Sequence, residues 1–262
     1  MLKYFLSKGL RIAFVDVEPT MPGCGEPVIL VHGFGSSHVV NWVNTQWIRY
    51  LNHAGYRVIA LDNRGHGASD KPHDPLCYSP DEMAGDVVAL MRHLGLGKAH
   101  LMGYSMGARI CAHFALMNPG PVQSLLLGGL GVHLVDGAGL PLGIADAMEA
   151  PSLDVLTDPM QRMFRAFADN NKSDLQALAA CIRGSRESLS ATDVGRIKTP
   201  TLISVGTNDP IAGSADELAM LMPRATAFAI QGRDHNLAVG DRSHKESVLA
   251  FIAAHPFAKS LP

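Results

Sequence analysis

The feature that most constrains the fold is the alternation of short apolar runs with stretches of helical spacing. Runs such as "PVILVHG" (27–33) and "AHLMGY" (99–104) are almost continuously apolar, as strands buried on both faces of a sheet are. Segments of helical spacing follow them, for example over residues 79–97 and 106–118. This alternation predicts an α/β fold with a mostly parallel central sheet and helices on both faces.

The alternation is interrupted once, over residues 131–196, where three helical patterns follow each other without a strand between them. It resumes with strand patterns at 200–206 and 225–232. Parallel sheets place their working loops at the carboxyl ends of the strands. We therefore expect residues 1–130 and 197–262 to form the core, and residues 131–196 to form a small helical cap over that edge.

Charge and cysteine content narrow the possible partners. The 22 basic and 24 acidic residues are mixed along the chain and give a net charge of -2, which argues against nucleic acid or a charged membrane surface as a partner. The four cysteines are far apart and form no C-x-x-C pair, so neither a disulfide framework nor a zinc site is expected. No run is long enough to span a membrane and no signal peptide is evident, so we expect a cytoplasmic protein whose oligomeric state stays open.

A serine stands between two glycines in "GYSMG" (103–107), after an apolar run and before a helical one. In this context G-x-S-x-G is typical of a sharp strand-to-helix turn that presents the serine hydroxyl at the edge of the sheet. Side chains at Gly103 and Gly107 would clash in such a turn, and Ser105 would adopt an unusual backbone conformation. The alternative is a glycine-rich turn without chemistry. We interpret Ser105 as a nucleophile.

The loop "HGFGSS" (32–37) follows an earlier apolar run and is the candidate partner of this serine. Acyl transfer to a serine needs two backbone N–H donors that face the developing oxyanion. Met106, at the start of the helical stretch, is expected to supply one, and Phe34 in the glycine-flanked loop the other. The alternative for this loop is an ordinary tight turn between a strand and a helix.

An acid and a histidine follow the last two predicted strands. Asp209 in "GTNDP" is placed to orient a histidine, although N-D-P is also turn chemistry. Its nearest rivals, Asp216 and Glu217, fall within a helical pattern. His235 in "GRDHN" lies after the final strand, whereas His244 falls inside the last helical pattern and is the weaker candidate.

With these segments in this order, the chain resembles the α/β-hydrolase superfamily, in its serine-nucleophile, esterase- or lipase-like branch with a short helical cap. The resemblance rests on "HGFG", "DNRGHGASDKP", "GYSMG", "GTNDP" and "GRDHN". The family order of nucleophile, acid and histidine implies a triad of Ser105, Asp209 and His235. In the second segment, Asp62 and Arg64 are implied to be structural.

The resemblance implies two-step acyl transfer through a covalent acyl-enzyme, without metal or organic cofactor. Serine at position 105 separates the chain from similar epoxide hydrolases and haloalkane dehalogenases, which carry aspartate there, and from dienelactone hydrolases, which carry cysteine. We expect a small-molecule acyl substrate, foremost a carboxylic ester with a modest apolar acyl group. Lactones and C–C bonds stay open as substrates, and so does a ligand-sensing receptor with slow turnover.

The cap itself carries an apolar stripe. Four residues recur there at helical spacing, namely Met160, Met163, Phe164 and Phe167. The stripe either packs the cap onto the core, which we favour, or lines part of an acyl pocket. The cap arginines form no evident cluster for a dicarboxylate substrate.

Overall fold

The computed structural model describes residues 1–137 and 139–258 and contains an eight-stranded sheet in the order β1-β2-β4-β3-β5-β6-β7-β8. The strands are β1 (Lys3–Ser7), β2 (Leu10–Val17), β3 (Pro27–Val31), β4 (Arg57–Leu61), β5 (Ala99–Tyr104), β6 (Val122–Gly128), β7 (Thr201–Gly206) and β8 (Ala225–Ile230). The six strands from β4 to β8 in this order are parallel to one another, whereas β2 pairs antiparallel with both β1 and β4.

The apolar runs form the buried strands that they predict. Every residue of β5 and β7 is buried, because helices cover both faces of the sheet there. The N-terminal strand β1 was not expected from the sequence. It pairs with β2 through a turn in which Lys8 and Gly9 both have positive φ angles, of 47° and 85°. The hairpin adds an antiparallel edge to an otherwise parallel sheet.

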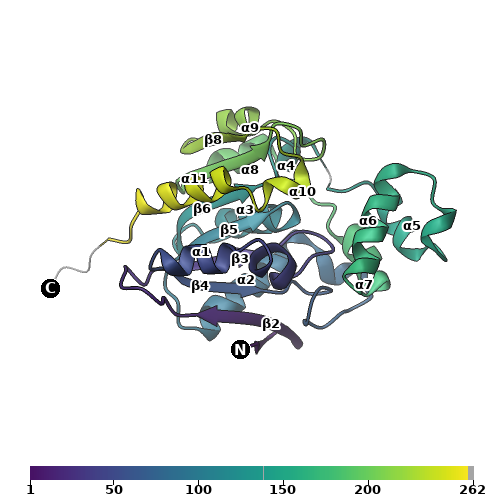
Figure 1. The fold of residues 1–262 in the computed structure, drawn as a ribbon, viewed down its shortest axis with the longest axis horizontal. Coiled ribbons are helices and arrows are strands. Elements are labelled where there is room, and N and C mark those ends of the chain that lie inside the picture. Colours follow the sequence, from purple (N-terminus) through teal and green to yellow (C-terminus); the bar gives the residue numbers. More distant parts are fainter. Residues whose placement is uncertain (138, 259–262) are drawn as a thin grey trace.

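Helices cover the two faces of the sheet (Figure 1). They are α1 (Trp47–His53), α2 (Pro80–His93), α3 (Met106–Met117), α4 (His133–Asp136), α5 (Gly143–Glu149), α6 (Pro159–Asn170), α7 (Leu175–Gly184), α8 (Ala191–Arg196), α9 (Ala215–Leu221), α10 (His235–Ala238) and α11 (Arg242–Ala253). One face of the sheet is covered by α2, α3, α8 and α9, which pack against the strands or against each other. The other face is covered by α1 and α11. Within the described residues, no helix is long and apolar enough to cross a bilayer.

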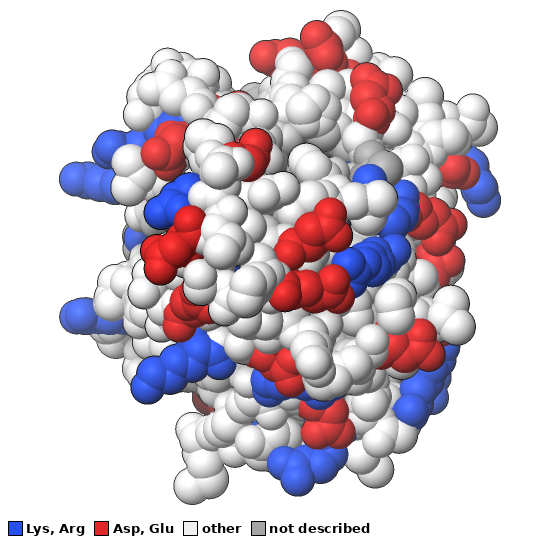
Figure 2. Space-filling model, turned by 90° about the vertical axis from the view of Figure 1, so that its right-hand side faces the viewer, with Lys and Arg blue, Asp and Glu red and all other residues white. Residues whose placement is uncertain are grey.

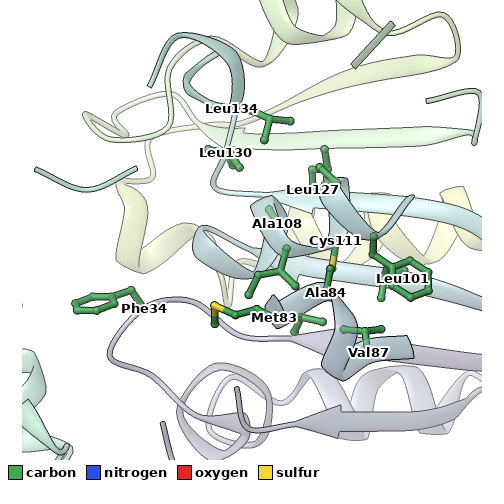
Figure 3. Packing of buried hydrophobic residues seen from close by; sticks show 14 of the residues in the cluster. Phe34, Met83, Ala84, Val87, Leu101, Ala108, Cys111, Leu127, Leu130 and Leu134 are labelled. Carbon is green, nitrogen blue, oxygen red and sulfur yellow. The ribbon is translucent and has the colours of Figure 1, made fainter. Parts of the chain in front are cut away.

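The larger core lies between α2, α3 and the central strands (Figure 3). Met83 and Val87 of α2 and Cys111 of α3 point toward Leu101 of β5 and Leu127 of β6, and all five are nearly excluded from solvent. Burial of each such side chain contributes roughly 1.5–3 kcal/mol relative to exposure. This packing holds α3 rigidly against β5, so the turn between them, which carries Ser105, sits on a rigid support.

The segment between β6 and β7 divides into two parts. Helix α5 packs against both α6 and α7, and α7 also packs against the turn Pro75–Tyr78 of the core. Figure 1 shows these three helices beyond the sheet, on the side where α10 lies. In contrast, α8 packs against α3 and α9. We propose a division into an α/β core and a cap whose main body is α5 to α7.

Candidate active site

Ser105 lies in the turn between β5 and α3, with φ 55° and ψ −116°. Its N–H donates to the carbonyl oxygen of Gly128, 2.8 Å away. A Cβ atom at Gly103 would lie 2.2 Å from the carbonyl oxygen of Gly107, and one at Gly107 would lie 2.0 Å from that of Val31. The expected steric need for both glycines and the strained serine backbone are therefore confirmed.

A continuous line of hydrogen bonds joins three residues that are distant in sequence. The Oγ of Ser105 lies 3.0 Å from Nε2 of His235, and Nδ1 of His235 lies 2.7 Å from Oδ2 of Asp209. The other carboxylate oxygen of Asp209 accepts the N–H groups of Ile211 and Ala212, at 2.8 and 3.1 Å. The Asp209 side chain is thus fully buried and held by two backbone N–H groups, with its other oxygen facing Nδ1 of His235.

The rival acid and histidine candidates lie elsewhere. Asp216 and Glu217 are exposed in the first turn of α9. His244 is buried within α11, where its Nδ1 lies 3.2 Å from the carbonyl oxygen of Ala238. Burial lowers the pKa of His244 to about 4, so its imidazole is neutral near pH 7.

Tyr104 contacts His235 through both its hydroxyl and its ring, and no spacing in the sequence predicts this contact. Its hydroxyl donates to the backbone carbonyl of His235 at 2.6 Å, and the two rings lie 5.5 Å apart. Burial raises the pKa of Tyr104 well above its ordinary value, so the hydroxyl stays protonated and remains a donor. The residue lies inside the "GYSMG" motif, but the motif does not specify its type.

The loop opposite the serine presents backbone donors. The N–H of Gly33 donates to Oδ1 of Asn41 at 2.8 Å, and Nδ1 of His32 lies 2.7 Å from the carbonyl oxygen of Gly33. The N–H and the carbonyl oxygen of Gly33, the residue before Phe34, are thus both held in place. Among the described residues, no acceptor receives the N–H of Phe34 or of Met106. Both groups are therefore available to an oxyanion at Ser105.

The segment "DNRGHGASDKP" supports this loop from within the core. Asp62 accepts the backbone N–H and the ring Nδ1 of His38 at 2.7 and 2.8 Å. Burial alone would raise its pKa, but the hydrogen bond from His38, the nearby rings of His32 and His38 and the N–H of Ala68 together outweigh burial and lower the pKa of Asp62 to about 2. Arg64 forms a buried bidentate pair with Asp86 of α2, at 2.7 and 2.8 Å. These contacts agree with a structural role for Asp62 and Arg64.

Comparison with known proteins identifies the family. The model of the alpha/beta hydrolase fold matches residues 26–142. A non-heme chloroperoxidase from Streptomyces lividans is 31% identical over 260 residues, which cover 88% of this chain and 91% of that protein. The chain belongs to the α/β-hydrolase superfamily. An epoxide hydrolase (Epoxide hydrolase 3) from Siraitia grosvenorii is 36% identical over 104 residues, 40% of this chain and 32% of that protein.

Solved structures show the same fold. An esterase from Exiguobacterium antarcticum superposes with a TM-score of 0.79 at 20% identity, over 97% of this chain and all of that one (100%). The protein is thus an α/β-hydrolase with esterase and hydrolase neighbours. The match to the epoxide hydrolase spans about a third of the length of that relative, so it supports the shared fold and not the activity of the whole protein.

Two cavities meet at Ser105 in this α/β-hydrolase, and Phe34 lines both. One has a volume of about 320 Å³ and is lined by Met106, so we call it the Met106 cavity. The other has a volume of about 530 Å³ and is lined by His235, so we call it the His235 cavity. The serine hydroxyl is therefore accessible from two sides.

The apolar stripe of α6 contributes to both cavities. Met160 lines the Met106 cavity, whereas Met163, Phe164 and Phe167 line the His235 cavity. Met160 and Phe164 also pack against buried core residues, and the Phe164 ring lies edge-on to that of Phe34, 6.0 Å away. Packing and pocket lining, the two interpretations of the stripe, therefore both apply.

Three arginines of the cap have partners within the protein. Arg165 forms an ion pair with Asp169, and Arg183 pairs with Glu149, while Arg162 donates to backbone carbonyls. Figure 2, which views the side where the cap lies, shows acidic and basic side chains interspersed, without a broad field of one sign. In the part of the chain that the structure describes, no group of three or more His, Cys, Asp or Glu side chains is arranged to hold a metal ion.

Proposed function

We propose that this α/β-hydrolase is a serine hydrolase that cleaves small carboxylic esters through a covalent acyl-enzyme, with Ser105, His235 and Asp209 as its catalytic triad. The observation that carries this proposal is the line of hydrogen bonds, 3.0 and 2.7 Å long, that joins the three side chains. Each residue follows a different strand of one sheet, so the rigid core sets their mutual geometry.

In the acylation step, Oγ of Ser105 attacks the ester carbonyl carbon while Nε2 of His235 takes the hydroxyl proton. The carbonyl oxygen becomes an oxyanion and receives the N–H groups of Phe34 and Met106. Loss of one such donor typically costs about 10²–10³ in rate. Asp209 keeps the ring oriented and stabilises the imidazolium. The C–O bond then breaks, and the alkoxide takes the proton from Nε2 and leaves as the alcohol.

In the deacylation step, a water molecule replaces the alcohol. His235 takes a proton from this water as its oxygen attacks the acyl carbon, and the same two N–H groups stabilise the second oxyanion. Collapse of this intermediate breaks the bond to Oγ, and Nε2 returns the proton to Ser105. The products are a carboxylic acid and the free enzyme.

Two measurements test the proposal. Ser105→Ala is expected to abolish hydrolysis of p-nitrophenyl acetate, while Ser247→Ala, on α11, keeps it. A fluorophosphonate followed by peptide mass spectrometry should label Ser105. Wild-type turnover in the Ser105 variant, or a label on another residue, would refute the nucleophile. A burst without steady turnover would instead indicate a ligand-sensing protein with slow hydrolysis.

A second candidate activity is suggested by the chloroperoxidase relative. Hydrogen peroxide in place of water at the acyl-enzyme would release a peracid and free Ser105. Peracid formation from an ester and hydrogen peroxide, measured against hydrolysis of the same ester, tests this activity. A panel that also contains lactones and β-diketones separates simple esters from the other substrates of the fold.

A further inference from the structure

The two cavities at Ser105 differ in the catalytic groups that they contain. Ser105 and Phe34 line both, but His235 lines only the larger cavity and Met106 only the smaller one. An ester bound at Ser105 has two parts, the acyl chain and the alcohol, which extend from the carbonyl carbon in different directions. The two parts therefore have two separate spaces available.

We infer that the Met106 cavity binds the acyl chain and the His235 cavity binds the alcohol of the substrate, an inference that rests on the proposed function. The reason is the route of the proton. Nε2 of His235 must reach the alcohol oxygen to protonate it as it leaves, within hydrogen-bond distance of about 2.6–3.2 Å. The alcohol thus lies on the side of His235, and the acyl chain takes the remaining side.

The walls of the Met106 cavity indicate an apolar acyl chain. Leu130, Met160 and Ile182 provide aliphatic surface. Arg109 also lines this cavity, but its guanidinium donates to three backbone carbonyls at the end of α4, at 2.8–3.2 Å. The Asp136 carboxylate lies in the same wall and opposes an anionic acyl group. The carbonyls engage two of the three guanidinium nitrogens of Arg109, so the aliphatic side chains give this wall its main binding surface.

The walls of the His235 cavity indicate an aromatic alcohol. The rings of Phe164 and Phe167 and the thioether of Met163 line one side, and all three come from α6. Aromatic side chains favour offset or edge-on contacts with aromatic ligands, worth about 0.5–1.5 kcal/mol beyond area burial. Asn170 and Asn236 add polar groups to this wall.

The volumes limit the size of each part. A non-hydrogen atom takes roughly 30 Å³, the share of a water molecule in the liquid. On this basis the Met106 cavity, about 320 Å³, holds about eleven non-hydrogen atoms, and the His235 cavity, about 530 Å³, holds about eighteen. The substrate class is thus an aryl or arylalkyl ester of an apolar acid of short to medium chain length.

One helix offers a matched pair of variants for the test. Met160 and Ala166 both lie on α6, but Met160 lines the Met106 cavity and Ala166 the His235 cavity. For Met160→Trp, we compare kcat/KM for p-nitrophenyl octanoate with kcat/KM for p-nitrophenyl acetate, and we expect this ratio to fall at least tenfold. Ala166→Trp is expected to lower the ratio for 1-naphthyl over methyl acetate by a similar factor. Each variant leaves the other ratio unchanged, and unaltered thermal unfolding shows that both are folded.

The rate of deacylation distinguishes the roles of the two cavities further, because the alcohol has already left the enzyme when deacylation begins. In single-turnover experiments, Met160→Trp should change the rate at which octanoyl-enzyme is hydrolysed, and Ala166→Trp should not. Reversal of these effects, or the same effect in both variants, would overturn the assignment. Failure of the proposed function is distinguishable, because then no acyl adduct of Ser105 forms in the wild-type protein.

Discussion

Asp209→Asn gives a sharp test of the proposed triad, because the structure determines how the new amide must turn. One carboxylate oxygen of Asp209 accepts two backbone N–H groups, at 2.8 and 3.1 Å, and the other faces Nδ1 of His235. In the variant, the amide oxygen stays with the two N–H donors, so the NH₂ group faces His235. The imidazole then carries its proton on Nε2 and cannot accept the proton of Ser105.

The size of the effect follows from the cost of turning the amide around. The reverse orientation leaves two buried N–H groups without an acceptor, at about 1–3 kcal/mol each. A total of about 2–6 kcal/mol corresponds to a factor of roughly 30 to 3 × 10⁴ in rate, and the imidazolium also loses its counter-charge. We therefore expect kcat for p-nitrophenyl acetate to fall about 10³–10⁴-fold, with little change in KM.

The matched control is Asp216→Asn, which removes a negative charge from the nearby α9 without contact to the histidine. Asp216 is exposed in the first turn of α9, so only a loss of about 0.3–1 kcal/mol in stability is expected, from the helix dipole. Its kcat should equal that of the wild type. If Asp209→Asn retained activity within tenfold of wild type, or if the control lost activity equally, the assigned role of Asp209 would be refuted.

Three further predictions concern the surroundings of the site. In Gly107→Ala, the new Cβ would lie 2.0 Å from the β3 backbone, so the turn before α3 must move away by more than 1 Å. We therefore expect roughly 100-fold lower kcat/KM and a lower melting temperature. The control Gly85→Ala, whose new Cβ has no atom within 4 Å, should retain full activity. Tyr104→Phe removes the hydroxyl that holds the α10 backbone, so urea unfolding should show a loss of about 0.5–1.5 kcal/mol; an unchanged midpoint would contradict this. Burial lowers the pKa of His66 to about 3 and that of His244 to about 4, below the ordinary 6.5. The unfolded chain therefore binds protons at a higher pH than the folded protein, so the free energy of unfolding is greatest above about pH 6.5 and decreases toward pH 4. A melting temperature that stays constant between pH 7 and 5 would show that these imidazoles are not buried in their neutral form.

Much of the fold was predictable because a buried parallel strand has a simple sequence signature. The runs at 27–33 and 99–104 are apolar at nearly every position because both faces of the sheet are covered, and β3 and β5 lie within them. Ser105 was recognisable for a related reason. Its turn is so tight that only glycine fits at positions 103 and 107, and this restriction is visible in the sequence itself.

Other elements lack such a signature. Residues 39–53 contain a π-helical turn, Val39–Val43, and then α1, with Gln46 between them at a positive φ of 66°. These irregularities break the 3.6-residue period on which helix prediction depends. Asn41 fixes the Gly33 peptide from inside this irregular segment. The contact of Asn41 with Gly33 depends on tertiary folding, so no rule of sequence spacing connects this residue with the loop 32–37.

The α6 stripe shows where sequence patterns stop being informative about specificity. Helical spacing places Met160 and Met163 on one face, and this much is a local property of the chain. The two residues nevertheless line different cavities, and Phe34, whose ring lies edge-on to that of Phe164, lines both of them. Phe34 comes from a loop more than a hundred residues earlier in the sequence. The proposed division into acyl and alcohol sides therefore depends on tertiary contacts between the loop and the cap.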